Sequence, residues 1–474
     1  MARHRGEPLQ IEGKRVLVMG LGTRQGGVGV ARYLVRNGAQ VTVTDLSSAD
    51  ALRASIDALA DLQVTYRLGE HVQEDFDAAD IIVRNPGVPV DSPWLQRARE
   101  RGTAIEMEMS LFFRACSAPI IGITGTKGKT STASICAGIL SRYRPDTVLA
   151  GNMGTSALNQ LDRIGQDTPV VLELSSWQLE GLALYEMSPE IAVLTNISED
   201  HLNRYRSMAD YIEAKRHIAR FQQAEDWFVV NRDEPRSWES RGVTSGRVVP
   251  FGLLSADEDG AGYDKGQLSW KWGGVRHPLV SRDEIPLKGD HVVGNALAAS
   301  AAALLAGAET DHVRDGLRAA SPVPHRQELI ATVDEVDFVN DTTATAPAAA
   351  IAALETFADR PIVLIAGGAS KGADLHRFAE KAARTAGVIV LLDGDETPGL
   401  LELLRASGAP QVEGPLTSMS EAVRISAELA RAGGVVLLSP GCASFGLFRD
   451  EFDRGDQFRE AVHRLRASTA GGAR

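Results

Sequence analysis

The segment that most narrows the possible folds of this chain is Thr124-Gly-Thr-Lys-Gly-Lys-Thr130. It follows an apolar run typical of a buried strand, residues 119–124, and a helical pattern begins at about Lys129. Such a turn lets backbone N–H groups converge on phosphate oxygens at the positive end of a helix, while a lysine reaches terminal phosphates and a threonine ligates Mg²⁺. We therefore predict an ATP-binding loop. Its residues are Gly125, Thr126, Lys127, Gly128, Lys129 and Thr130.

Apolar runs alternate with helical patterns along the chain, which predicts an α/β fold with mainly parallel sheets. The pattern starts at residues 15–20, restarts at residues 119–124 and restarts again at residues 361–365. Residues 253–280 indicate a small antiparallel excursion. A chain of 474 residues is too long for one hydrophobic core, and Pro322 and Pro324 form a hinge or linker. We predict three domains, at residues 1–116, 117–322 and 323–474.

Both glycine-rich turns of the sequence have alternative interpretations. The loop at residues 124–130 is shorter than the common G-x-x-x-x-G-K-[ST] pattern, so a chance glycine turn stays open. Gly20-Leu-Gly22 follows the first apolar run, and Asp45 stands where a Rossmann unit places its ribose-binding carboxylate. This second turn is compatible with a dinucleotide-binding dehydrogenase or with a tight strand–helix turn that binds nothing.

Charge and cysteine content bear on partners and location. Lysine and arginine number 50 against 62 aspartate and glutamate, which gives a net charge of -12 and argues against nucleic-acid or membrane partners. The three cysteines are widely spaced and show no metal-ligand pattern. No signal peptide and no run of 18 apolar residues is present. We predict a cytoplasmic protein.

Several segments together resemble the Mur ligase family, over nearly the whole chain and in the family's order and spacing. They are Gly20-Leu-Gly22, Asn85-Pro-Gly87, Thr124 to Thr130, Gly151-Asn-Met-Gly154, Glu173 to Gln178, Asn196 to His201, Lys215, Asn295, His325-Arg326, Asp341 to Thr345 and Ser439 to Ser444.

The resemblance implies an ATP-dependent ligase that adds D-glutamate to UDP-N-acetylmuramoyl-L-alanine, through an acyl phosphate, in the synthesis of peptidoglycan precursors. It implies a Rossmann-like first domain that binds the UDP substrate without redox chemistry. The central domain would be a P-loop ATPase-type parallel sheet, and the Rossmann-like third domain would take up glutamate and close over ATP. A monomer is expected.

The resemblance also implies the catalytic and metal-binding residues. Lys129, His201 and Lys215 would be catalytic. Two Mg²⁺ ions would be held by Thr130, Glu173, His201 and Lys215, the last of which carries CO₂ as a carbamate. Without the resemblance, Lys215 would be interpreted as a solvated helix lysine and His201 as a surface or capping histidine.

The remaining predicted contacts divide between nucleotide and substrates. ATP would also contact Asn295, Arg326 and Asp341. The UDP substrate and glutamate would contact Gly22, Thr23, Asp45, Asn152, Ser175, Gln178, Thr345, Lys371 and Ser444. The alternatives are a helix start for Ser175 and Gln178 and an ion pair between Arg326 and Asp341.

Some positions depart from the family pattern. Lys127 stands where asparagine is common, Val292 replaces an expected asparagine, and Thr343 replaces a lysine. The change at Thr343 lies near the amino-acid pocket and leaves L-glutamate open as the alternative amino acid. Another Mur-type ligase, a dehydrogenase and a catalytically silent nucleotide-binding regulator are further alternatives.

Overall fold

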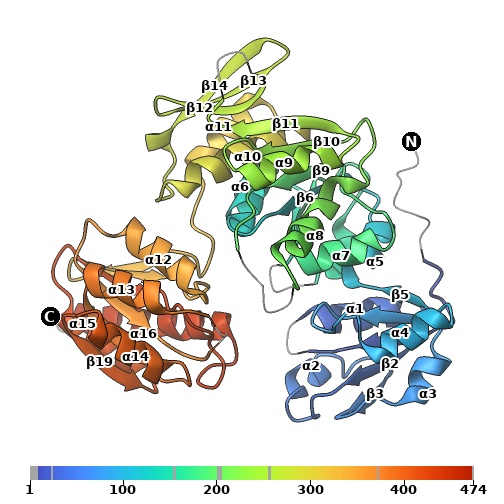
Figure 1. Cartoon of the computed structure of the whole chain (residues 1–474), viewed down its shortest axis with the longest axis horizontal. Coiled ribbons are helices and arrows are strands. Elements are labelled where there is room, and N and C mark those ends of the chain that lie inside the picture. The colour runs from blue at the N-terminus through green and yellow to red at the C-terminus, as the bar shows by residue number, and fades with distance from the viewer. Residues whose placement is uncertain are drawn as a thin grey trace. The chain divides into compact units, whose positions relative to one another are not determined.

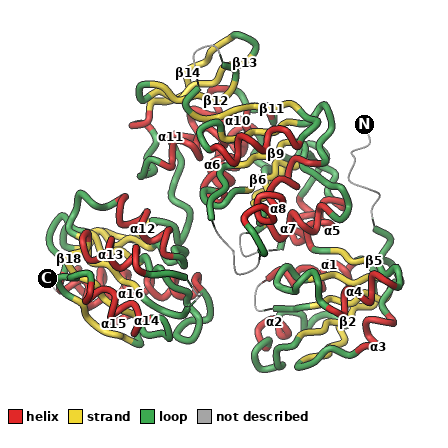
Figure 2. Tube along the Cα trace, in the orientation of Figure 1, coloured by secondary structure: helices red, strands yellow, loops and turns green. Residues whose placement is uncertain are grey.

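The computed structural model describes residues 9–22, 25–152, 156–199, 205–254, 258–370 and 373–471. The chain divides into two compact units, Met1–Pro286 with Asp290–Ala320, and Leu287–Gly289 with Ser321–Arg474. Three mainly parallel sheets flanked by helices confirm the predicted α/β fold (Figures 1 and 2).

The first sheet has five strands in the order β3-β2-β1-β4-β5, all parallel. Its strands are β1 (Arg15–Met19), β2 (Gln40–Asp45), β3 (Val64–Leu68), β4 (Ile81–Arg84) and β5 (Ala104–Glu106), and its helices are α1 (Gln25–Arg36), α2 (Arg53–Asp57), α3 (Gln73–Ala78) and α4 (Pro93–Glu100). The strand order reverses between β1 and β4. In open α/β sheets, ligands bind beyond the carboxyl ends of the strands at such a reversal.

The second sheet has nine strands in the order β14-β13-β12-β11-β10-β9-β6-β8-β7. The strands are β6 (Ile120–Thr124), β7 (Val148–Gly151), β8 (Val170–Glu173), β9 (Ile191–Leu194), β10 (Trp227–Asn231), β11 (Arg247–Gly252), β12 (Gly260–Asp264), β13 (Gln267–Trp272) and β14 (Val275–Ser281). The pairings among β6 to β12 are all parallel. The pairings of β12 with β13 and of β13 with β14 are antiparallel. The antiparallel excursion predicted within residues 253–280 is therefore confirmed.

The helices of this second part follow its strands. They are α6 (Lys129–Tyr143), α7 (Ser176–Ala183), α8 (Met208–Arg220), α9 (Pro235–Glu239), α10 (His291–Leu305) and α11 (Thr310–Arg318), with short 3₁₀ turns η1 (Ala157–Arg163), η2 (Ser240–Val243) and η3 (Arg282–Glu284). Helix α6 begins at the predicted Lys129, immediately after the glycine loop.

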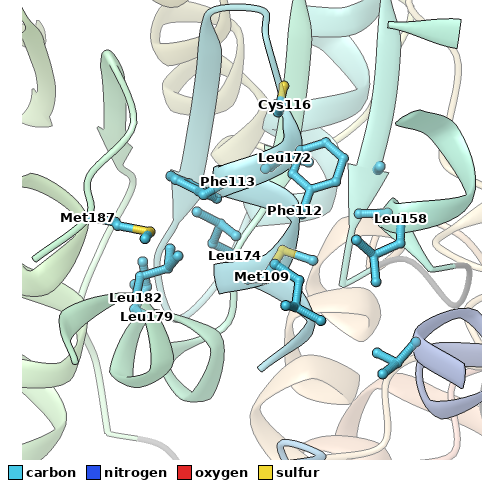
Figure 3. Packing of buried hydrophobic residues seen from close by; sticks show 14 of the residues in the cluster. Met109, Phe112, Phe113, Cys116, Leu158, Leu172, Leu174, Leu179, Leu182 and Met187 are labelled. Atoms are coloured by element: carbon cyan, nitrogen blue, oxygen red, sulfur yellow. The ribbon is translucent and has the colours of Figure 1, made fainter. Parts of the chain in front are cut away.

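Helix α5 (Glu108–Ala115) joins the first two sheets into one compact unit. It follows the last strand of the first sheet, yet its apolar side chains pack on the second. Met109, Phe112 and Phe113 lie in one buried cluster with Leu172 of β8 and Leu179 of α7 (Figure 3). Each fully buried side chain of this size stabilises the fold by roughly 1.5–3 kcal/mol.

The third sheet has the order β15-β16-β20-β17-β18-β19, in which only the β15–β16 pairing is antiparallel. Its elements are β15 (Glu328–Val333), β16 (Val336–Asn340), α12 (Pro347–Thr356), β17 (Ile362–Ala366), α13 (His376–Thr385), β18 (Ala386–Leu392), α14 (Thr397–Ala406), β19 (Val412–Leu416), α15 (Met419–Leu429), β20 (Val435–Leu438) and α16 (Glu451–Gly471). Within the described stretches, no helix is long and apolar enough to cross a membrane.

Candidate active site

The glycine loop after β6 has a backbone shape that only glycine tolerates at two positions. Gly125 and Gly128 have φ angles of 156° and 78°. A Cβ atom would lie 1.9 Å from Thr195 Oγ1 at the first position and 2.3 Å from Asn295 Oδ1 at the second. The loop leads directly into the 15-residue helix α6, whose N-terminal N–H groups form an anion-binding end.

Residues directly after β9 hold this loop in place. Asn196 accepts hydrogen bonds from the backbone N–H groups of Thr126 and Lys127, each at 2.8 Å, through its carbonyl and its side-chain oxygen. Thr195 Oγ1 donates to the Lys127 carbonyl at 2.7 Å. The loop is therefore shaped by the protein itself, as expected of a preorganised site.

Two lysine ammonium groups converge on one carbonyl of the loop. Lys129 Nζ donates to the carbonyls of Gly125 and Thr126, at 3.1 and 3.0 Å. Lys215 Nζ, from α8, donates to the same Gly125 carbonyl at 2.7 Å and lies 4.8 Å from the centre of the Tyr211 ring. Lys215 is only 2% exposed, so its interpretation as a solvated helix lysine is wrong.

Glu173 ends β8, the strand beside β6, where its backbone pairs in register with Ile123. Its Oε1 accepts a hydrogen bond from Asn152 Nδ2 at 3.0 Å. Its Oε2 is buried and has no hydrogen-bond partner among the residues that the structure describes. A buried carboxylate oxygen without a partner is costly, and a hard cation such as Mg²⁺ would satisfy it. The residues present thus fit a magnesium ion beside the loop.

The structure gives less information on the other predicted metal ligands, Thr130 and His201. Thr130 lies buried in the first turn of α6. His201 lies outside the described residues. Within the described stretches, no group of three or more histidine, cysteine, aspartate or glutamate residues is placed to hold a metal ion. Among the described residues, the structure therefore brings Lys129 and Lys215 together at Gly125 and places Glu173 on the neighbouring strand.

Asn295 of α10 is buried next to Gly128. Its Oδ1 accepts a hydrogen bond from Thr132 Oγ1 at 3.3 Å. Its Nδ2 has no partner among the described residues, so a buried N–H₂ donor remains available to a ligand at the glycine loop.

In the first sheet, Asp45 completes the turn after β1. Its carboxylate accepts backbone hydrogen bonds from Leu21 at 2.8 Å and from Gly22 at 3.0 Å, and its second oxygen accepts one from Ser47 at 2.8 Å. The carboxylate that a dehydrogenase would offer to a ribose is thus engaged by its own backbone. Thr23 lies outside the described residues.

Ser175 and Gln178 form the start of α7. The Ser175 backbone N–H donates to Gln178 Oε1 at 2.9 Å, and the Gln178 backbone N–H donates to Ser175 Oγ at 3.3 Å. This reciprocal cap is the helix-start role considered as the alternative. A substrate contact by either side chain stays a prediction.

In the second unit, Asp341 follows β16 and is buried. Its carboxylate accepts hydrogen bonds from Ser439 Oγ at 2.8 Å and from the Gln327 backbone N–H at 3.2 Å. Burial raises the pKa of Asp341 to about 7, and the charge of Arg326 opposes that rise. His325 and Gln327, on either side of Arg326, have positive φ angles of 66° and 45°, a strained conformation that concentrates at functional sites.

Two predicted amino-acid contacts lie at the same end of this sheet. Ser444 follows β20 and is 3% exposed, and its Oγ has no hydrogen-bond partner among the described residues. The Thr345 backbone N–H donates to the Thr343 carbonyl at 2.8 Å, in the turn after β16. Thr343 Oγ1 donates to the His325 carbonyl at 2.9 Å. Lys371 lies outside the described residues.

No role was predicted from the sequence for three residues that shape the glycine loop, although one of them, Asn196, begins a segment that resembles the family. Tyr211 Oη lies 3.2 Å from Thr126 Oγ1, and Thr195 and Asn196 bind the loop backbone as described above. A signal for Tyr211 existed, because it stands four positions before Lys215 and so shares its helix face. The signal for Thr195 and Asn196 was their position directly after a buried strand.

Family models match three stretches of the chain. Residues 14–106 match the "Mur ligase MurD-like, N-terminal domain", residues 123–303 the "Mur ligase middle domain", and residues 325–442 the "Mur ligase, glutamate ligase domain". A UDP-N-acetylmuramoylalanine--D-glutamate ligase from Roseiflexus sp. is 48% identical over 463 residues, which cover 96% of this chain and 99% of that protein. A protein of the same name from Symbiobacterium thermophilum is 38% identical over 95% of this chain and 98% of its own length.

Solved structures agree on the fold. The UDP-N-acetylmuramate-alanine ligase MurC from Thermotoga maritima superposes with a TM-score of 0.61, at 21% identity, over 96% of this chain and all of that one. MurF ligase from Thermotoga maritima, solved in complex with ADP, superposes with a TM-score of 0.56, at 16% identity, over 98% of this chain and all of that one. The family models and the two relatives show that this chain belongs to the Mur ligase family.

Proposed function

We propose that this chain joins D-glutamate to UDP-N-acetylmuramoyl-L-alanine with hydrolysis of ATP to ADP and phosphate, in the synthesis of peptidoglycan precursors. The relatives named above, whose full length it matches, support this reaction. Membership of the Mur ligase family also removes the dehydrogenase alternative. The predicted roles of residues 1–116 in UDP binding, 117–322 in ATP binding and 323–474 in glutamate binding belong to this proposal.

The observation that carries the proposal is the arrangement around Gly125. Two ammonium groups meet at its carbonyl, and the buried Oε2 of Glu173, at the end of the adjacent strand, has no partner among the described residues. The positive charge of Lys129 beside a site for a hard cation is what transfer of a phosphoryl group between two anions requires, and Lys215, as the carbamate proposed below, would add an oxygen ligand for the cation.

The chemistry proceeds in two steps. A carboxylate oxygen of the muramoyl-alanine attacks the γ-phosphorus of ATP, the bond from that phosphorus to the bridging oxygen breaks, and ADP leaves. The amine of glutamate then attacks the acyl phosphate, loses a proton and releases phosphate. We assign Lys129 to the γ-phosphoryl group, because its Nζ already lies on the loop. The loop from Gly125 to Thr130, with the N-terminus of α6, would hold the phosphates, and Asn295, Arg326 and Asp341 would hold the rest of ATP.

Magnesium would supply positive charge for both steps. Thr130, Glu173, His201 and Lys215 are the ligands proposed for two ions, and the unpartnered Glu173 Oε2 supports the first of these sites. For Lys215 we propose a carbamate, formed when its neutral amine adds CO₂ and loses a proton. The burial of Lys215 supports this role, since a carbamate is protected where bulk water is excluded.

The substrate contacts are proposals of the same kind. Gly22, Thr23, Asp45, Asn152, Ser175 and Gln178 are assigned to the UDP substrate, and Thr345, Lys371 and Ser444 to glutamate. The buried, unpartnered Ser444 Oγ supports its part in the glutamate pocket. The cytoplasmic location and the monomeric state stay predictions.

The direct test is phosphate release from ATP in the presence of UDP-N-acetylmuramoyl-L-alanine, with D-glutamate and L-glutamate offered separately. We expect phosphate release when D-glutamate is offered together with the muramoyl substrate. When the muramoyl substrate is omitted, we expect no release with either amino acid. Release with L-glutamate alone would favour the stereochemical alternative that Thr343 leaves open. No release with either amino acid would refute the proposed reaction.

The carbamate has its own test. Lys215→Ala should be nearly inactive, because the variant lacks an anionic oxygen ligand, and formate or acetate should restore part of the activity by taking that place. Lys129→Ala is the matched control, since a carboxylate cannot replace a lost cation. Full activity of Lys215→Ala would refute the assignment.

A further inference from the structure

Arg454 is a fully buried arginine in the first turns of α16, with 0% exposure. Its Nε donates to Thr342 Oγ1 at 3.0 Å and its Nη2 to the Thr342 carbonyl at 2.9 Å. Its Nη1 donates to the carbonyls of Cys442 and Ala443 at 3.3 and 3.2 Å, and Nη2 also reaches Cys442 at 3.4 Å. One guanidinium group therefore binds both the turn after β16 and the turn after β20.

A third turn joins this arrangement through the backbone. Ala369, after β17, exchanges two backbone hydrogen bonds of 2.9 Å with Ala443, so the Ala443 carbonyl accepts from both Ala369 and Arg454. A Cβ atom on Gly368 would lie 2.2 Å from that carbonyl and 3.5 Å from Arg454 Nη1. Strands β16, β20 and β17 are neighbours in the sheet, so Arg454 binds two of their carboxyl-end turns directly and the third through Ala443.

The next residue of α16 explains how the helix comes this close. A Cβ atom on Gly455 would lie 2.3 Å from His325 Nδ1 and 2.5 Å from Thr342 Cγ2. The Gly455 carbonyl also accepts a hydrogen bond from Asn340 Nδ2 at 3.1 Å. Any larger residue at position 455 would push α16 away from the turn that Arg454 binds.

Burying a guanidinium group costs folding free energy that uncharged oxygen partners offset only in part. Burial lowers the pKa of Arg454 to about 10, so the group is still charged at neutral pH. If the position only filled the core, an apolar side chain would stabilise the fold more than an arginine does. The hydrogen bonds instead fix the backbone at Thr342, three positions before Thr345, and at Cys442 and Ala443, directly before Ser444.

We propose that Arg454 is a positioning residue, which holds the turns after β16 and β20 so that Thr345 and Ser444 are presented to the incoming amino acid. The inference rests on the glutamate pocket of the proposed function. Asp341, assigned to ATP, is held by Ser439 and Gln327 instead. Loss of Arg454 therefore affects glutamate far more than ATP.

The test compares Arg454→Met with Arg464→Met in the full chain, by steady-state kinetics with each of the three substrates varied in turn. Arg464 is the matched control, because it is an exposed arginine of the same helix, paired with Glu460. We expect Arg454→Met to raise the KM for D-glutamate about 30-fold, since the lost bonds are charge-assisted. The KM values for ATP and the muramoyl substrate should stay within about twofold, as all three should in Arg464→Met.

Arg454→Lys keeps the charge but reaches fewer of the oxygens, so it should raise the KM for glutamate only about fivefold. This variant carries the test if Arg454→Met does not fold. An unchanged KM for glutamate in a folded variant, or an equal rise of all three KM values, would overturn the proposal.

Hydrogen–deuterium exchange separates this inference from the proposed reaction. Peptides covering residues 342–345 and 442–446 should exchange faster in the Arg454 variants and not in Arg464→Met. That readout needs no turnover, so it decides the role of Arg454 even if wild-type protein releases no phosphate. Unchanged exchange would overturn the proposal.

Discussion

The turns after β1 and β6 are both glycine-rich turns between a strand and a helix, but side chains of opposite charge bind their backbones. In the first turn, the Asp45 carboxylate accepts from the N–H groups of Leu21 and Gly22. In the second, the ammonium groups of Lys129 and Lys215 donate to the Gly125 carbonyl. The backbone N–H groups of the first turn thus donate to a carboxylate of the protein, whereas a carbonyl of the second turn accepts from two lysine side chains.

The difference shows why a glycine pattern alone does not identify a phosphate site. An N–H group that already donates to a buried carboxylate has little capacity left for a phosphate oxygen, so the Leu21 and Gly22 amides serve the fold first. The loop at residues 125–130 has carbonyls that accept from Lys129 and Lys215, and it leads into the N-terminus of α6, where N–H groups can bind an anion. The charge of the neighbouring residues thus separates two turns that look alike in sequence.

The largest effect that this comparison predicts is the loss of activity in Lys129→Ala. Removing the cation should lower kcat on the order of 10³-fold, because charge that develops on the phosphoryl group loses its nearest partner. The thermal midpoint should change little. Rates of phosphate release would measure the effect, with the exposed Lys14→Ala as control. A loss of less than tenfold would break the contrast between the turns.

Asp45→Ala should act mainly on stability. The variant leaves the N–H groups of Leu21, Gly22 and Ser47 without their acceptor, which should lower the free energy of unfolding by about 3 kcal/mol. Urea denaturation would measure this, with Asp50→Ala as the exposed control in the following loop. If Asp45→Ala instead left the free energy of unfolding unchanged, the carboxylate would not hold the turn and the comparison would fail.

The sequence predicted what depends on local pattern. The start of α6 at Lys129 follows from a strand, a glycine turn and a helical run that are contiguous in the chain. By contrast, the first turn of α10, from His291, contains Val292, Val293 and Gly294, which are weak helix formers, so its helical state depends on packing.

Contacts between distant segments could not be predicted in this way. The burial of Lys215 depends on where α8 lies against the loop. Two of the five hydrogen bonds of Arg454 go to Thr342, 112 positions earlier in the chain, and the other three go to Cys442 and Ala443. The role of Asp45 in holding backbone N–H groups also needs the structure, whereas the helix start at Ser175 and Gln178 was among the interpretations of the sequence. Family resemblance named Lys215 and passed over Arg454.

A smaller effect concerns Glu108, the first residue of α5, which lies between the two turns in the sequence. Its Oε1 accepts from Ser156 Oγ at 2.5 Å and from the Ala157 N–H at 2.9 Å, and a Cβ atom on Gly26 would lie 3.4 Å from its Oε2. Burial raises the pKa of Glu108 to about 7 from 4.5. The folded state therefore binds more protons than the unfolded state between these values, and stability is lost as the pH rises through this window.

Glu108→Gln should remove this pH dependence. The free energy of unfolding of the variant minus that of wild type should rise by on the order of 2 kcal/mol from pH 5 to pH 8. The reason is that glutamine accepts the same hydrogen bonds without ionising. Urea denaturation at both pH values would measure the gain, and the exposed Glu100→Gln serves as control. A gain that is equal at the two pH values would show that Glu108 does not titrate in this window.

The smallest effect is expected at Lys127, where the family commonly has asparagine. This residue is held through its backbone, since its N–H donates to Asn196 Oδ1 and its carbonyl accepts from Thr195 Oγ1, while its side chain is exposed. Lys127→Asn should therefore raise the KM for ATP no more than about threefold, the worth of one solvent-screened charge. Steady-state kinetics at low and high salt would measure it, because a screened charge loses its contribution as salt rises. A rise as large as that of Lys129→Ala would mean that the loop binds phosphate through whichever lysines it carries, rather than through one lysine that the protein holds in place.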